Sequence, residues 1–118
     1  MRTDLEHLPA NKQRELDRVK QIIFEEFEDA LALARHDWKK KGRILKVILY
    51  GSYARGGWVD EPHTAKGYQS DYDVLIIVND QRLTDRVTYW SKLDQRLILE
   101  LTVTKGLRTP VNFIVHTL

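Results

Sequence analysis

The sequence predicts an α/β or α+β sandwich that consists of a small sheet and two long helices. Three observations lead to this fold class. The chain has 118 residues, of which 42% are hydrophobic, so it can bury one core but not two. Two long stretches repeat apolar residues every three or four positions, as amphipathic helices do. Three short apolar runs are bounded by glycine, proline or an Asn-Asp pair, as buried strands are.

The first helix is expected over residues 11–36, and the basic run at residues 39–43 is interpreted as its end. Cations near the negative pole of a helix and a glycine stop are typical of a helix C-terminus. A basic phosphate-binding patch is the alternative interpretation of this run. The apolar stripe of the helix consists of Leu16, Val19, Ile23, Phe27, Leu31 and Ala34.

Two strands are expected in the middle of the chain. Residues 44–50, ILKVILY, are short, rich in β-branched side chains and followed by glycine. Residues 73–78, DVLIIV, are apolar at both alternate positions. A strand of that kind is expected to be covered on both faces of its sheet.

The second helix is expected over residues 84–104, with Thr84 as its N-cap and Gly106 as its stop. The segment LILELTV near its end resembles a strand when it is read alone. The apolar repeat, however, continues backwards from it in steps of three and four to Leu83. Residues 110–116 give the third strand, which a proline opens.

Composition restricts the function further. The chain has no cysteine, which excludes disulfides and thiolate metal sites. Neither a signal peptide nor a membrane-spanning run is found, so a cytoplasmic protein without membrane contact is expected. The net charge of +2 does not by itself indicate nucleic acid as a partner.

The whole chain, residues 1–118, is expected to be one domain, with an N-terminal helix in residues 1–43 and a core in residues 44–118. Three strands and two helices make a thin sheet. The chain is therefore expected to be a fragment of a longer protein, to need a partner, or to form an oligomer.

A glycine-rich turn, GSYARGG, directly follows the first expected strand. Gly51 allows close approach of the backbone, Ser52 offers a hydroxyl and an amide, and Arg55 supplies a planar cation suited to phosphate. The turn is not a P-loop, because Gly57 and Trp58 stand where that motif needs Lys and Ser or Thr. A plain strand-ending turn is the alternative, and the turn alone does not decide between the two.

Two aspartates, Asp71 and Asp73, open the second expected strand, and residues two apart on a strand project from the same face. Carboxylates held side by side repel unless a cation lies between them, and hard oxygen ligands suit Mg²⁺. Taken alone, the pair could also be a solvated acidic loop. Next to a turn that holds phosphate, it indicates phosphoryl or nucleotidyl transfer, in which catalysis rests on positioning and charge neutralisation.

The combined pattern GSYARGG…SDYDVLIIV resembles the signature of the nucleotidyltransferase superfamily, in which G-S, often extended to G-S-x-A-R-G, precedes D-x-D or D-x-E on the next strand. That superfamily includes DNA polymerase beta, kanamycin nucleotidyltransferase and the minimal nucleotidyltransferases. The resemblance covers residues 44–116 and implies a mixed sheet, an NTP substrate with ATP as first choice, and Mg²⁺. It also implies that Gly51 and Ser52 bind the triphosphate, while Asp71 and Asp73 ligate the metal as the catalytic residues.

The spacer between the two motifs is longer than in the compact members that the chain resembles. Residues 57–69 are interpreted as a flap over the nucleotide, a partner-binding loop or a tolerated insertion. Three polar residues of this segment are expected to be solvated rather than metal ligands: Asp60, Glu61 and His63.

The third carboxylate of active members is replaced by Asn112. An asparagine can offer a carbonyl oxygen to a metal, but it carries no charge and cannot act as a base. His116 on the same face is a conceivable substitute base, although a structural role is more usual for a histidine at a strand end.

Three functions remain open from the sequence. The first is a Mg-dependent enzyme that transfers NMP from an NTP to a hydroxyl acceptor. The second is a nucleotide-binding regulatory or antitoxin subunit. The resemblance implies it, since minimal nucleotidyltransferases are often encoded with helical HEPN partners, or fused to them, in toxin–antitoxin systems. The third and weakest is a nucleic-acid module that uses Trp38 and residues 39–43.

Overall fold

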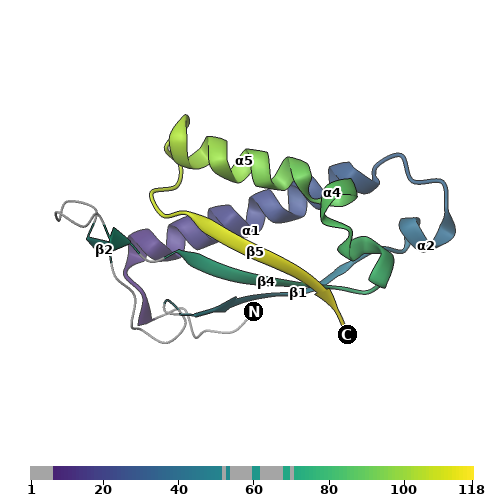
Figure 1. The fold of residues 1–118 in the computed structure, drawn as a ribbon, viewed down its shortest axis with the longest axis horizontal. Coiled ribbons are helices and arrows are strands. Elements are labelled where there is room, and N and C mark those ends of the chain that lie inside the picture. Colours follow the sequence, from purple (N-terminus) through teal and green to yellow (C-terminus); the bar gives the residue numbers. More distant parts are fainter. Residues whose placement is uncertain (1–6, 52, 54–59, 62–67, 70) are drawn as a thin grey trace.

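The computed structural model describes residues 7–51, 53, 60–61, 68–69 and 71–118 (Figure 1). Within this part the elements are α1 (Ala10–Leu31), α2 (Asp37–Lys40), β1 (Ile44–Tyr50), β2 (Asp60–Glu61), β3 (Tyr68–Gln69), β4 (Tyr72–Val78), the 3₁₀ turn η2 (Gln81–Thr84), α4 (Arg86–Tyr89), α5 (Ser91–Thr102) and β5 (Val111–Thr117).

Strands β1, β4 and β5 form one sheet in that spatial order. The central strand β4 runs antiparallel to β1 and parallel to β5. The connection from β4 to β5 passes through α4 and α5, as two parallel neighbours require. Strands β2 and β3 form a separate antiparallel pair. A mixed sheet with flanking helices and a long N-terminal helix confirms the predicted fold class.

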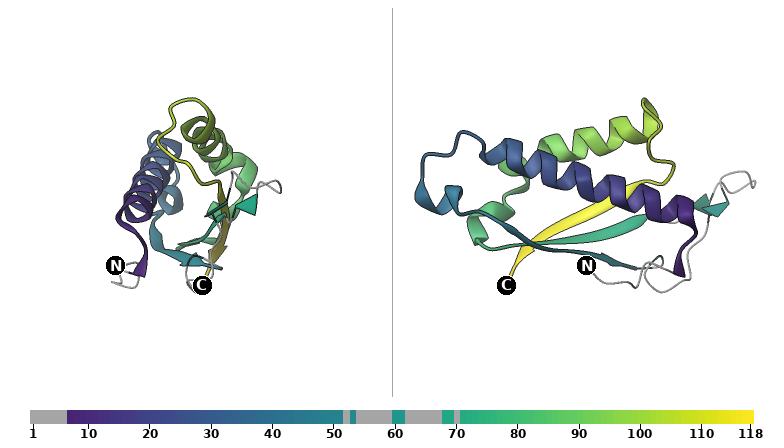
Figure 2. Two further views of the ribbon diagram at one scale, coloured as in Figure 1. Left: turned by 90° about the vertical axis from the view of Figure 1, so that its left-hand side faces the viewer. Right: turned by 180° about the vertical axis from the view of Figure 1, so that it is seen from behind.

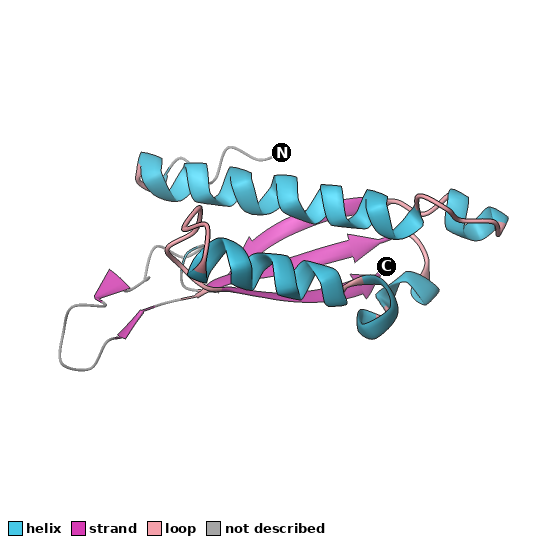
Figure 3. Ribbon diagram, turned by 90° about the horizontal axis from the view of Figure 1, so that it is seen from above, coloured by secondary structure: helices cyan, strands magenta, loops and turns pink. Residues whose placement is uncertain are grey.

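Both long helices, α1 and α5, lie side by side on the same face of the sheet (Figure 2 and Figure 3). The opposite face carries Ile48 of β1 and Ile114 of β5, whose side chains are 40% and 41% exposed. No helix of the described part lies on this second face, yet Ile77 of β4 is only 9% exposed there. The prediction that β4 is covered on both faces is therefore confirmed for the helix side alone. The alternate side chains of β4 that pack under the helices are nearly fully buried: Tyr72, Val74, Ile76 and Val78.

Trp90 joins the two helices to the sheet. Its ring stacks on Phe27 of α1 with centroids 5.5 Å apart, and it lies 6.3 Å from the ring of Phe113 on β5. The indole nitrogen is satisfied as well, because Nε1 donates to the carbonyl of Leu83 at 2.7 Å. A large aromatic ring can be fully buried here because its one polar atom has a partner.

The first helix is shorter than the predicted span of residues 11–36. Helix α1 ends at Leu31, where turn-like hydrogen bonds run from the Ala32 N–H to Asp29 and from the Ala34 N–H to Leu31. Ala34 adds little apolar surface to the stripe, so the core does not hold the chain in a helix this far.

Among the described residues, no helix combines the length and apolar character that a bilayer crossing needs.

The basic run at residues 39–43 ends α2 rather than α1, so the predicted helix boundary was wrong. The run caps the shorter helix instead. The Arg43 guanidinium donates to the carbonyl of Lys40, the last residue of α2, and to that of Gly42, two residues beyond it.

The predicted helix over residues 84–104 is divided into η2, α4 and α5. The N-cap of α4 is Asp85, whose carboxylate accepts a hydrogen bond from the Thr88 N–H, and the assignment of this role to Thr84 was wrong. Helical geometry is interrupted again at Trp90, with φ −123° and ψ 0°. The apolar repeat runs through these breaks, because Trp90 contributes to the same core as the helix that follows it.

Helix α5 ends at Thr102, before Gly106, so glycine is not the stop that the sequence predicted. Lys105 takes the left-handed conformation instead, with φ +62°. Gly106 has a packing role, since the Glu100 carboxylate lies where a Cβ at residue 106 would project.

Ion pairs tie α1 to α5 where the two helices lie side by side. Arg18 reaches the Glu100 carboxylate at 2.7 Å, and Arg96 reaches Glu25 at 2.7 Å and Glu26 at 3.0 Å. The hydrogen bond from Arg18 lowers the pKa of Glu100 from its ordinary value of 4.5, against the opposing effect of burial. The charged form of this carboxylate is thus favoured by the folded chain.

We predict that Glu100→Gln reduces the loss of stability of the folded chain at acid pH. Because the pKa of Glu100 is lower in the folded state, its stabilisation is complete above 4.5 and is lost as pH falls through the lowered folded value. The variant should therefore be less stable than wild type at neutral pH, and the difference should shrink as the pH falls below 4.5. Melting temperatures followed by circular dichroism across this range measure the effect.

Asp17→Asn is the matched control for this prediction, since Asp17 is an exposed carboxylate on α1. It should leave the acid limb of the stability curve unchanged. A constant difference between Glu100→Gln and wild type at every pH would contradict the prediction.

Candidate functional site

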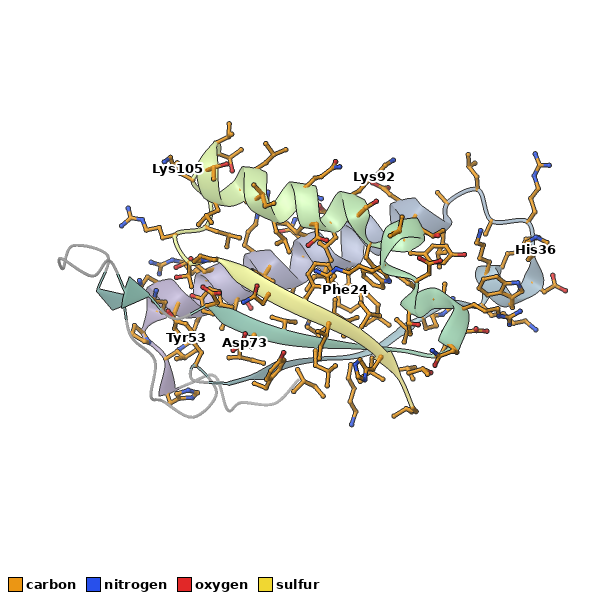
Figure 4. All side chains as sticks on the ribbon, viewed as in Figure 1. Phe24, His36, Tyr53, Asp73, Lys92 and Lys105 are labelled. Carbon is orange, nitrogen blue, oxygen red and sulfur yellow. The ribbon has the colours of Figure 1, made fainter. Side chains whose placement is uncertain are left out.

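The ends of three strands meet at one end of the sheet. Because β1 is antiparallel to β4 and β5 is parallel to it, the last residue of β1 and the first residues of β4 and β5 are neighbours. Asp73 is paired with Tyr50 on one side and with Asn112 on the other. Paired residues on adjacent strands share a face, so these three side chains form a row on the face opposite to the helices. Figure 4 shows Asp73 at this end of the molecule.

Asn112 links the two aspartates. It is the register partner of Asp73, and its Nδ2 donates to Oδ2 of Asp71 at 2.7 Å. Asp71 and Asp73 lie two residues apart, on either side of Tyr72. The structure thus brings together the aspartate pair and the asparagine that stands in place of a third carboxylate.

Gly51 is required where it stands for two reasons. Its φ of +75° lies in the left-handed region, which side chains with a Cβ rarely adopt. In addition, the Asp73 carboxylate lies where a Cβ at residue 51 would project. The close approach that the glycine permits is therefore made by a side chain of the same site.

Apart from Tyr53, the remaining residues of the glycine-rich turn lie outside the described residues, as does most of the spacer. This applies to Ser52 and Arg55, for which phosphate binding is predicted, and to His63. Of the segment 57–69 the structure describes only the backbone pair of β2 and β3, which joins Asp60 to Gln69.

Two tyrosines under the site were missed by the sequence analysis. Tyr53, in the glycine-rich turn (Figure 4), and Tyr72, between the aspartates, are both fully buried. Their ring centroids are 4.5 Å apart. Burial, together with the nearby Glu15 carboxylate, raises the pKa of the Tyr72 phenol well above 10.0, so it stays neutral. Strand alternation could have predicted one of them: if Asp71 and Asp73 face outwards, Tyr72 faces the core.

Two candidates from the sequence are separated from the aspartates. His116 is four residues beyond Asn112 on β5, which is about 13 Å at about 3.3 Å per residue. The basic run at residues 39–43 precedes Ile44, which pairs with Val78 at the opposite end of β4. Neither can act at the row formed by Tyr50, Asp73 and Asn112.

The site offers hard oxygen donors in a small set. Within the described part of the chain, no group of three or more histidines, aspartates and glutamates is placed to hold a metal. The aspartate pair and the Asn112 amide are the groups that converge here. Such a set has the chemistry of a divalent cation site with two anionic ligands and one neutral ligand.

Comparison with known proteins gives a partial match. A protein of Methanocaldococcus jannaschii with the name "Putative protein adenylyltransferase MJ0604" is 49% identical to this chain over 39 residues. The matched stretch spans 33% of this chain and 31% of the length of that relative. No protein-family model and no solved structure matches the chain. The likeness is therefore confined to one segment, about a third of each of the two proteins.

We predict that Gly51→Ala lowers the free energy of unfolding by about 1–3 kcal/mol and displaces Asp73. Alanine at residue 51 would have to adopt a positive φ, and its Cβ would collide with the Asp73 carboxylate. Urea unfolding measures the loss of stability, and the backbone amide signal of Asp73 in an ¹⁵N-correlated NMR spectrum reports the displacement.

Gly42→Ala is the control for a general packing effect of an added methyl group. Its Cβ would meet the side-chain ends of Leu31 and Leu83 and the backbone carbonyl oxygen of Lys39, so it also adds local crowding, but residue 42 lacks a positive φ. It should leave the Asp73 signal in place. An Asp73 signal that does not move in Gly51→Ala would refute the proposed contact.

Proposed function

We propose that this chain binds an NTP with Mg²⁺ at the end of the sheet marked by Gly51, Asp71 and Asp73, and transfers NMP to a hydroxyl acceptor. The observation that carries the proposal is the register of β4, which places Asp73 against Gly51 and beside Asn112. The name of the partial relative favours ATP as the nucleotide and a protein hydroxyl as the acceptor.

The residues at this end of the sheet fit Mg²⁺ by their chemistry. Asp71 and Asp73 supply two carboxylates on one face, and Asn112 supplies an amide whose Nδ2 already donates to Asp71. The two carboxylates repel each other, and the hydrogen bond from Asn112 offsets part of this repulsion. A hard cation between the carboxylates would offset it further. When bound, the ion would neutralise charge on the phosphates and polarise the phosphorus under attack.

Each residue has a distinct part in the proposed reaction. Asp71 and Asp73 hold the ion, while Ser52 and Arg55 hold the triphosphate from the turn. The acceptor oxygen forms a bond to the α-phosphorus, the bond to the bridging oxygen breaks, and pyrophosphate leaves. The hydroxyl proton passes to water, because Asn112, unlike a carboxylate, cannot accept it. Transfer by this chain is therefore expected to be slow.

The second candidate is a nucleotide-binding regulatory or antitoxin subunit that works with a helical partner of the HEPN type. Two observations favour it. The first is that Asn112 leaves the proposed site without a third carboxylate. The second is that the sheet face that carries Ile48 and Ile114 has no helical layer among the described residues. Nucleotide binding without turnover, together with co-purification of a helical protein, would support this function over transfer.

We predict that the wild-type chain binds ATP in a Mg-dependent manner and that Asp73→Asn weakens this binding by about tenfold or more, or about 1.4 kcal/mol. The substitution removes one of the two charges that hold the ion. Isothermal titration with ATP, in the presence of Mg²⁺ or of EDTA, measures binding. Incubation with α-³²P-labelled ATP measures label transfer.

Asp37→Asn is the control for this prediction, since Asp37 is an exposed carboxylate on α2. Equal Mg–ATP affinity of Asp73→Asn and wild type would remove Asp73 from the site.

We predict that Asn112→Asp lowers stability by about 1 kcal/mol without Mg²⁺ and increases the stabilisation that Mg²⁺ provides. The variant replaces an amide that donates to Asp71 with a third carboxylate, so repulsion replaces a hydrogen bond until a cation binds. Melting temperatures with and without Mg²⁺ measure the change, and label transfer tests for a gain of activity.

The control for this variant is His116→Asp. It places a carboxylate on the same face of β5, but at the other end of the strand. A Mg²⁺ response of Asn112→Asp that does not exceed that of His116→Asp would count against a metal site at the aspartates.

A further inference from the structure

A buried lysine on α1, Lys12, contacts side chains from several distant segments. It is 2% exposed. Its Nζ donates to Oγ1 of Thr109 at 3.0 Å and lies 5.5 Å from the ring centroid of Tyr53 and 5.9 Å from that of Tyr72. Both distances to the rings are within the range of a cation–π interaction.

These three partners come from the three segments that carry the proposed site. Tyr53 belongs to the glycine-rich turn that begins at Gly51. Tyr72 separates the two aspartates, and Thr109 lies three residues before Asn112. The Lys12 ammonium therefore contacts one residue from each of the three segments that carry the proposed site.

The charge of Lys12 is compensated locally. Its Nζ lies 3.9 Å from Oε1 of Glu15, one turn further along α1. The other carboxylate oxygen of Glu15 accepts a hydrogen bond from the backbone N–H of Arg108 at 2.9 Å, next to Thr109. Burial of an ammonium is costly unless it is paired and hydrogen-bonded, and here it is both.

We propose that Lys12 is a positioning residue for the nucleotide site, an inference that rests on the proposed function of that site. It holds Tyr53 and Tyr72 together and fixes the segment that leads into β5. Tyr72 points away from the aspartates on either side of it, so the backbone position at which its ring is held is also the position from which both carboxylates project. The contact to Thr109 sets the entry into β5, and hence the place from which Asn112 reaches Asp71.

Lys12→Met separates positioning from packing. Methionine fills nearly the same volume and keeps the apolar stem, but it removes the hydrogen bond to Thr109, the ion pair with Glu15 and the cation above the two rings. If Lys12 were only a packing element, the variant would alter stability and leave the site side of the sheet unchanged.

The experiment compares ¹⁵N-labelled wild type, Lys12→Met and Lys20→Met in NMR spectra of the full chain. Lys20 is an exposed lysine on the same helix and serves as the matched control. In Lys12→Met we expect the backbone amides of Gly51 and Asp73 and the side-chain amide of Asn112 to shift or broaden. The affinity for ATP with Mg²⁺, measured by titration calorimetry, should fall by about tenfold. Lys20→Met should match wild type in both measurements.

Site signals that coincide with those of wild type in a folded Lys12→Met would overturn the proposal, as would an unchanged Mg–ATP affinity in a chain that binds the nucleotide. If Lys12→Met does not fold, Thr109→Val decides, since it removes only the hydroxyl that accepts from Lys12. A shifted Asn112 side-chain signal in Thr109→Val supports the role, and an unchanged one overturns it. Wild type that binds no nucleotide would end the proposed function, while the NMR comparison would still decide whether Lys12 positions these residues.

Discussion

The arrangement of the candidate site depends on the register of β4 against its two neighbours. With Asp73 opposite Tyr50 and Asn112, the outward positions of β4 carry the carboxylates and the inward positions carry Tyr72 and Val74. A slip of one residue would place carboxylates under the helices and a tyrosine in solvent. The cost of burying those charges without partners is what makes this register the stable one.

The two faces of the sheet therefore differ in what their side chains contribute. The helix side supplies the stability, through a core in which Trp90 contacts both Phe27 of α1 and Phe113 of β5. The other side supplies the chemistry that the aspartates and Asn112 offer. The two sides are coupled through the strand backbone, because consecutive residues alternate between them. Tyr72 is the clearest example, since its ring is locked against Tyr53 while the residues on either side of it face outwards.

The sequence predicted the three strands of the main sheet well, missed the short pair β2 and β3, and predicted the helices less well. A buried strand is a short, continuous apolar run, and its limits at Gly51 and Pro110 are set by residues that end or precede strands. The helical repeat, in contrast, records only which residues face the core. Trp90 faces the core from outside the helix, so the repeat passed unbroken through Asp85 and Trp90, where the helices are separate.

The same distinction applies to the site. Gly51, Asp71 and Asp73 could be named from motif spacing, because strand pairing converts such spacing into proximity. Asn112 was named only through the resemblance to the superfamily, as the position that matches its third carboxylate. Lys12 could not be named, because its contacts span 97 residues to Thr109 and no local pattern marks a lysine on an amphipathic helix as buried. Its position follows only from the way α1 packs on the sheet.

The hydrogen bond from Asn112 to Asp71 determines how the proposed site would respond to a cation. Asn112 offers Asp71 a neutral donor, which reduces the repulsion between the two aspartates without adding charge. An incoming ion would compete with that donor for the same carboxylate oxygen, or Asn112 would turn its carbonyl oxygen towards the ion. In both cases the aspartate pair is stable in the folded chain before the ion binds. The ion then binds less tightly than it would to three carboxylates. A site built in this way favours reversible nucleotide binding over rapid transfer, and a carboxylate at position 112 shifts that balance in the opposite direction.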